Sequence, residues 1–221
     1  MVILTASTPT HKVTKRPRSQ DAFVLDTPRV LILGHSFIKR LKQFVQNNSN
    51  DFDLDFQISS PVLIRWHGVG GRTVEKTLKF NTHVLHSFRP DVVILQLGSN
   101  DLVTLSPLRV GSAIDEFVHF LHDSCGVQLV CVCQTIRRFS AEAFNTKVGM
   151  LTRYLRVVLD PIPYAMFWGH RGFWQAKENF YTPDGVHLNS RGQRKLYRSL
   201  RGAVLRSLRL LPSSPSSEGV C

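Results

Sequence analysis

Short apolar runs alternate along the chain with longer segments in which apolar residues recur every three or four positions. The short runs have the length of buried strands, and they lie at residues 30–33, 62–66, 92–97, 127–133 and 165–168. The longer segments have the helical period, and they lie at residues 37–46, 74–88, 107–122, 141–158 and 190–210. Residues 52–58 are a further, weaker strand candidate. The alternation predicts an α/β fold, a three-layer sandwich with a five-stranded parallel sheet.

The two ends of the chain lack this periodicity. Residues 1–28 contain Pro, Ser, Thr and basic residues, and residues 211–221 are rich in Ser and Pro. We therefore predict a basic disordered tail at 1–28, one domain at 29–210 and a second disordered tail at 211–221. Within the domain, Asn189 is placed to cap the last helix.

The net charge of +12 is concentrated in two places. Lys12, Lys15, Arg16 and Arg18 carry four positive charges, and residues 191–209 carry seven more, with no acidic residue in either stretch. The rest of the chain holds 17 basic and 16 acidic residues, so it is almost neutral. The basic face of the last helix is either simply solvated or the surface for an anionic partner, such as nonspecifically bound nucleic acid.

No apolar run reaches the roughly 20 residues that a membrane-spanning helix needs. The first residues also lack the order of charged and apolar segments that defines a signal peptide. The four cysteines have no CxxC spacing, so we expect reduced thiols in a cytoplasmic protein, with a nuclear location as the alternative. The histidines show no metal-binding spacing, and we expect no metal and no cofactor.

Polar residues follow three of the predicted strands, where ligands bind in parallel sheets. Ser36 stands at the first strand-to-helix turn, as a helix cap or as a reactive hydroxyl. Asn100 follows the third strand, and the glycine-rich loop at 68–73 matches no nucleotide-binding motif. Asp184 lies three residues before His187, a spacing that suits either a loop-ordering hydrogen bond or a catalytic pair.

Together these residues resemble the SGNH hydrolases, also called GDSL esterases and lipases. Four sequence blocks match in order, and they are Gly34-His35-Ser36, Gly70-Gly71-Arg72-Thr73, Gly98-Ser99-Asn100-Asp101 and Asp184-Gly185-Val186-His187. The resemblance spans residues 29 to about 205 and implies a flavodoxin-like sheet and a serine esterase that cleaves carboxylic esters.

The resemblance also implies roles for individual residues. Ser36 is the expected nucleophile, His187 the general base and then acid, and Asp184 the carboxylate that orients the imidazole. The backbone amides of Ser36 and Gly71 and the side-chain amide of Asn100 are the expected oxyanion hole. His35 stands where the family often has Asp, but its position next to Ser36 favours His187 as the base.

The five aromatic residues near the predicted strand ends, Trp66, Phe167, Trp168, Phe173 and Trp174, are expected to pack in the core or to form an apolar wall for a substrate. Similar domains accompany RNA-binding segments in proteins of some non-LTR retrotransposons. The alternative hypothesis is therefore a module of retroelement origin that binds RNA or another polyanion through its basic tail and last helix. The expected partner of the first hypothesis is a small-molecule or acylated ester, and the sequence predicts no oligomeric state.

Overall fold

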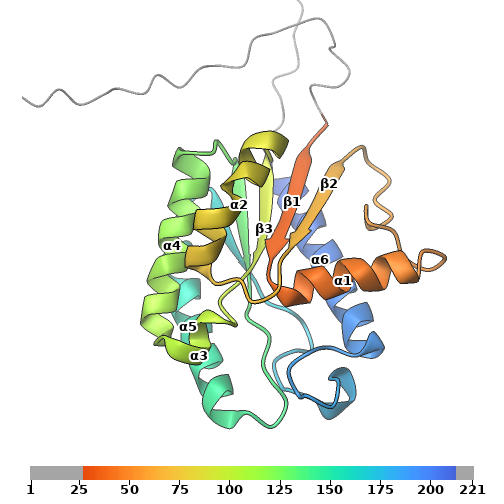
Figure 1. Ribbon diagram of the computed structural model, residues 1–221. Coiled ribbons are helices and arrows are strands. Elements are labelled where there is room, and N and C mark those ends of the chain that lie inside the picture. Colours follow the sequence, from red (N-terminus) through yellow and green to blue (C-terminus); the bar gives the residue numbers. More distant parts are fainter. Residues whose placement is uncertain (1–26, 213–221) are drawn as a thin grey trace, which may run out of the picture.

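The computed structural model describes residues 27–212, which form a parallel sheet covered by helices on both faces (Figure 1). Its strands are β1 (Arg29–Gly34), β2 (Leu63–Gly68), β3 (Val92–Gln96), β4 (Leu129–Cys133) and β5 (Ala165–Trp168). The strand order is β2-β1-β3-β4-β5, and every neighbouring pair is parallel. This order confirms the predicted five-stranded sheet of flavodoxin-like type.

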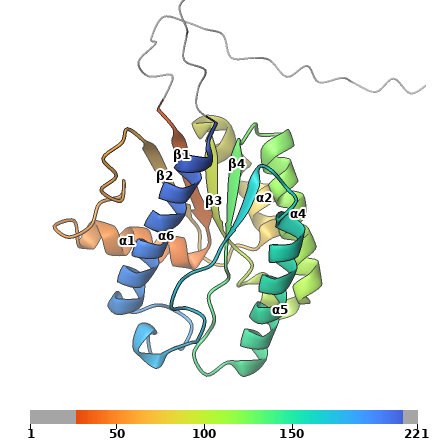
Figure 2. The same cartoon turned by 180° about the vertical axis from the view of Figure 1, so that it is seen from behind.

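Two layers of helices complete the sandwich. On one face lie α1 (Ser36–Asn47) and α6 (Ser190–Leu210), and on the other lie α2 (Val74–Phe88), α4 (Pro107–Asp123) and α5 (Glu142–Leu159) (Figures 1 and 2). Two short helices that the periodicity did not predict are α3 (Asp101–Thr104) and η1 (Glu178–Phe180). Both are too short to show a helical repeat in the sequence.

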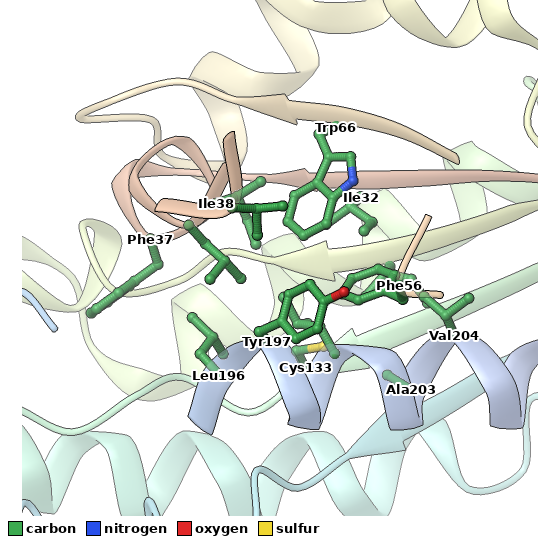
Figure 3. Packing of buried hydrophobic residues seen from close by; sticks show 14 of the residues in the cluster. Ile32, Phe37, Ile38, Phe56, Trp66, Cys133, Leu196, Tyr197, Ala203 and Val204 are labelled. Atoms are coloured by element: carbon green, nitrogen blue, oxygen red, sulfur yellow. The ribbon is translucent and has the colours of Figure 1, made fainter. Parts of the chain in front are cut away.

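Each face of the sheet has its own apolar core. Leu196, Leu200 and Val204 of α6 are fully buried on the α1 side, in agreement with the helical period predicted for residues 190–210. Figure 3 shows this core, in which Phe56 and Tyr197 pack beside Trp66 of β2. Because β1 and β3 are covered on both faces, they are continuous apolar runs rather than alternating ones.

The strand candidate at residues 52–58 is wrong. Phe56 and Gln57 have positive φ angles of 60° and 54°, which no regular strand allows. The segment is a loop that carries Phe52 and Phe56 into the core against Tyr197, with ring centroids 4.9 Å away in both cases. Its apolar residues therefore seal the core beside β2 without extending the sheet.

Some predictions concern residues that lie outside the described range. The basic cluster at 12–18, the terminal segment 213–221 and Cys221 belong to this group. The cysteines that can be placed in residues 27–212 are unpaired, and burial raises the pKa of the Cys133 thiol. Within the same range, no helix has the length and apolar character needed to cross a bilayer.

Candidate active site

Ser36 is the first residue of α1 and directly follows the end of the central strand β1. The turn is tight because Gly34 lies against β3: a Cβ at this position would come within 2.6 Å of the Gln96 carbonyl oxygen. The His35 amide donates to the same oxygen at 3.4 Å. Ser36 is thus held at the carboxyl edge of the sheet, between two of its innermost strands.

The residue that caps α1 is His35, not Ser36. Its Nδ1 accepts a hydrogen bond from the Phe37 amide at 3.5 Å, so the interpretation of Ser36 as the helix cap is wrong. Within residues 27–212 the Ser36 hydroxyl has no recorded hydrogen-bond partner, so capping does not explain a serine there. Burial, Arg138 and His187 lower the pKa of His35 from its ordinary 6.5 to about 3, which keeps the ring neutral.

Asp184 and His187 form a close pair on the loop before α6. Asp184 Oδ2 lies 2.6 Å from His187 Nδ1, while its Oδ1 accepts from the Thr182 hydroxyl and from the amides of Val186 and His187. Oδ1 therefore orders the loop, as one of the two predicted alternatives has it, while Oδ2 faces the imidazole, a geometry that a catalytic pair would also need. Desolvation alone would raise the pKa of the Asp184 carboxyl, but the hydrogen bonds from His187 and Thr182 hold it well below its usual range.

The carboxylate fixes which nitrogen of His187 carries the proton. Because ionised Asp184 only accepts, Nδ1 is the donor and Nε2 is left with its lone pair. Nε2 has no recorded hydrogen-bond partner in the described part of the chain, and the side chain is 22% exposed. The His187 ring lies 6.3 Å from the ring of Phe37, so the imidazole is beside the first turn of α1.

The three predicted oxyanion-hole residues follow β1, β2 and β3: Ser36 begins α1, and Gly71 and Asn100 lie on the loops after β2 and β3. Asn100 Nδ2 donates to the Arg72 carbonyl oxygen at 2.8 Å, which joins the β3 loop to the β2 loop and leaves the second amide hydrogen available. Gly71 has φ of +70°, and nothing lies within 4 Å of the place where its Cβ would be. Its amide and that of Ser36 donate to no recorded acceptor among residues 27–212.

Asp101 also joins these two loops, a role that the sequence did not reveal. Its Oδ1 accepts from the Val74 amide, the first amide of α2, at 3.0 Å. Burial raises the pKa of this carboxyl, since only 3% of the residue is exposed. Asp101 therefore fixes the β2 loop, with Gly71 on it, against the loop that carries Asn100.

The loop after β4 is another part of the site that sequence reasoning missed. The Phe139 amide donates to the Gly185 carbonyl oxygen at 2.7 Å, and Arg138 Nη2 donates to the Ser99 carbonyl oxygen at 3.3 Å. This loop bridges the Asp184–His187 loop and the Asn100 loop. Arg138 and Phe139 belong to none of the four sequence blocks, so no local signal singled them out.

His170 is the most buried of the remaining histidines, and it has a structural role. Its Nε2 lies 2.7 Å from Gln96 Oε1 and its Nδ1 lies 2.8 Å from Ser199 Oγ, while burial lowers its pKa to about 3. Within residues 27–212, no group of three or more His, Cys, Asp or Glu side chains is placed to hold a metal ion.

The aromatic residues near the strand ends divide between core and surface. Trp66 and Phe173 are buried in the core, Phe167 and Trp168 are half-buried, and Trp174 is 49% exposed. Packing therefore accounts for the first two residues, whereas Trp174 remains open to solvent.

The flavodoxin-like sheet and the segments at its carboxyl edge define a hydrolase of the SGNH type. The family model for GDSL-like lipases and acylhydrolases matches residues 34–200, most of the described domain. The chain therefore belongs to the GDSL-like lipase/acylhydrolase family. This membership supports ester hydrolysis as the general activity, as predicted from the four sequence blocks.

Solved structures of low sequence identity have the same fold. A lipase/acylhydrolase from Enterococcus faecalis is 17% identical with a TM-score of 0.61, over 85% of this chain and 100% of its own. A GDSL-like lipase from Bacteroides thetaiotaomicron is 16% identical with a TM-score of 0.59, over 81% and 88% of the two chains. A psychrotrophic esterase from Pseudoalteromonas sp., inhibited by monoethylphosphonate, is 14% identical with a TM-score of 0.59, over 82% and 98%. No curated protein matches the chain.

Proposed function

We propose that the protein is a serine esterase that cleaves carboxylic esters through an acyl-serine intermediate, with Ser36, His187 and Asp184 as its catalytic residues. The observation that carries the proposal is the 2.6 Å contact between Asp184 Oδ2 and His187 Nδ1, beside the helix turn that begins with Ser36. The family match supports the general activity, and the proposal adds the mechanism.

In the first half of the reaction, His187 Nε2 accepts the Ser36 hydroxyl proton while the Ser36 oxygen attacks the ester carbonyl carbon. The imidazolium then gives this proton to the leaving alcohol, and the acyl group stays on Ser36. In the second half, His187 takes a proton from water as the water oxygen attacks the acyl carbon. The imidazolium then returns this proton to the Ser36 oxygen as its bond to the acyl carbon breaks, which releases the carboxylic acid and restores the serine. Asp184 stays ionised throughout and stabilises the transient imidazolium.

The tetrahedral intermediate carries a negative charge on the former carbonyl oxygen. We assign its stabilisation to the amides of Ser36 and Gly71 and to Asn100 Nδ2. The Ser36 amide lies at the positive end of α1, which favours the same charge. A single donor of this kind can contribute about 3 to 4 kcal/mol to the transition state.

The alternative hypothesis, an RNA- or polyanion-binding module, has no support from the family match or from the solved structures. It stays a prediction, as do the retroelement origin and the cytoplasmic or nuclear location. The class of ester is also open: sugar acetates, short-chain acyl lipids and thioesters all contain the reacting carbonyl group.

The test is hydrolysis of a short-chain p-nitrophenyl ester, together with labelling by a fluorophosphonate. Ser36→Ala should lower turnover by about 10³-fold or more and abolish labelling, because no other group replaces the nucleophile. Ser190→Ala is the matched control, since Ser190 is also the first residue of a helix, and it should keep both activities. A folded wild-type protein that neither turns over the ester nor accepts the label would refute the proposal.

A further inference from the structure

A strongly basic pocket lies between α6 and the chain that leads from β5 to η1. Its volume is about 580 Å³, within the usual range for small-molecule sites. Five cationic side chains line it: Arg171, Arg191, Arg194, Lys195 and Arg198. Its lining does not include Ser36, Asp184 or His187, so it is separate from the candidate catalytic residues.

The four cations of α6 are spaced so that they share one face of the helix. Arg191 and Lys195 are four residues apart, as are Arg194 and Arg198, and like charges at this spacing repel and destabilise a helix. Within residues 27–212, Arg194 is the one cation of the pocket that pairs with a carboxylate. Its Nη2 lies 3.7 Å from Asp51 Oδ2, and both side chains are exposed. The pocket therefore concentrates positive charge that the described chain leaves almost uncompensated.

Two of these cations are held in place by an aromatic ring. Arg191 and Lys195 lie over the ring of Phe180, at 5.7 Å and 5.2 Å from its centroid. The end of the Lys195 side chain also packs against Gly172, where a Cβ would clash with it. Phe180 is itself buried, so it offers a fixed ring face to Arg191, which is exposed, and to Lys195, which is partly buried.

The hydroxyl of Ser199, in the pocket wall, already makes hydrogen bonds within the protein and does not donate to an anion. Ser199 Oγ accepts from Trp168 Nε1 at 3.1 Å and lies 2.8 Å from His170 Nδ1. Gln96 Nε2 donates to the Gln134 carbonyl oxygen, so Gln96 Oε1 must accept from His170 Nε2. His170 Nδ1 is then an acceptor, and the Ser199 proton is directed to it. An anion in the pocket is left with the guanidinium and ammonium groups as its donors.

We propose that this pocket binds a compact small molecule that carries two or more phosphate groups. Guanidinium groups bind phosphate oxygens through paired hydrogen bonds, and several arginines around one cavity suit several phosphates. The limited volume favours a small polyphosphate over a polynucleotide, whose backbone needs an extended basic track. The bound anion would also relieve the repulsion between the cations of α6.

The test is calorimetric titration of the full-length protein with tripolyphosphate at low salt. We expect saturable binding that weakens as salt is added. Arg191→Gln combined with Arg198→Gln should weaken the affinity by about tenfold or more, since two charged donors are lost. The matched control combines Arg206→Gln with Arg209→Gln, which removes two exposed charges of the same helix away from the pocket. It should change the affinity by less than about twofold.

Three results would overturn the proposal. One is the absence of saturable binding to wild-type protein whose fold is confirmed by circular dichroism. Another is equal weakening in both double variants, which would mean that the overall charge attracts the anion. The third is a single-stranded oligonucleotide that binds through Arg191 and Arg198 more tightly than tripolyphosphate, which would make the pocket part of a nucleic-acid surface. None of these measurements depends on esterase activity.

Discussion

Two histidines at the same end of the sheet have opposite environments. His187 is partly exposed and pairs with the carboxylate of Asp184 at 2.6 Å, whereas His170 is fully buried between Gln96 and Ser199. The first ring has a permanent negative charge beside it and an unoccupied Nε2. The second has neutral partners on both nitrogens.

The difference shows what an imidazole needs for proton transfer. A ring that cycles between neutral and charged forms needs a counterion for the charged form and access for the group that supplies the proton. Burial lowers the pKa of His170 to about 3, so protonation there is prohibitive at neutral pH. His170, which follows β5, instead links β3 to α6 through its contacts with Gln96 and Ser199, while His187 is suited to proton transfer.

Replacing each histidine by glutamine gives the largest contrast. His187→Gln should reduce ester turnover by about 10⁴-fold or more with little change in the free energy of unfolding, because a general base is lost from an exposed loop. His170→Gln should destabilise the fold by about 1 to 3 kcal/mol but keep most of the turnover per folded molecule. Ester kinetics and urea unfolding of both variants test this, and equal kinetic losses would remove the distinction.

Removing the partner of each histidine gives the next largest effects. Asp184→Asn should lower turnover by about 10³ to 10⁴-fold, since an amide no longer fixes the proton on Nδ1. Ser199→Ala should mainly destabilise, by about 1 to 3 kcal/mol, because Trp168 Nε1 and His170 Nδ1 lose their partner. Kinetics normalised to the folded fraction separate the two outcomes. A Ser199→Ala variant with a kinetic loss as large as that of Asp184→Asn would contradict the comparison.

The pH dependence of stability gives a smaller and gradual effect. Burial is the main reason that the pKa of His35 and of His170 is about 3 in the folded protein, below the value near 6.5 of an unfolded chain. Their contribution to stability is therefore complete above about pH 6.5 and is lost as the pH falls toward 3. Each of these two histidines should lower the free energy of unfolding by up to about 1.4 kcal/mol for every pH unit below 6.5 in that window. Burial also lowers the pKa of His67, which adds in the same direction.

Urea unfolding at pH 6.5, 5.5 and 4.5 measures this slope. The control is His170→Gln, whose free energy of unfolding should fall less steeply than that of the wild type, since one titrating group is gone. A wild-type stability that does not change between these pH values would show that the buried rings are hydrated or already charged.

Local patterns predicted the elements well wherever packing agreed with them. The helical period of residues 190–210 agrees with the burial of Leu196, Leu200 and Val204, and Asn189 caps this helix, as predicted, by accepting from the Gly192 amide at 3.1 Å. The prediction of a strand at residues 52–58 was wrong because the apolar side chains of this segment fill the core from a loop. The composition of the segment does not reveal that Phe56 and Gln57 adopt left-handed backbone angles.

The sequence predicted those residues of the candidate site that belong to the four short sequence blocks. Ser36 begins α1 directly after β1, and Gly71, Asn100, Asp184 and His187 lie on loops. The network of Gln96, His170 and Ser199 was not predictable, because Gln96 and His170 are 74 positions apart and His170 and Ser199 are 29 apart. The cap formed by His35 depends on a side-chain rotamer, which the sequence also does not specify.

The proposed nucleophile and its base belong to parts of the chain that should open at very different rates. Ser36 follows β1, whose residues 30–33 are at most 1% exposed, so amide hydrogens there should exchange with solvent only in rare, global openings. The Asp184 side chain is 48% exposed on the loop between η1 and α6, where small local openings suffice for exchange. Mild denaturant should therefore separate the base from the serine while the sheet is still intact, and inactivation should precede unfolding.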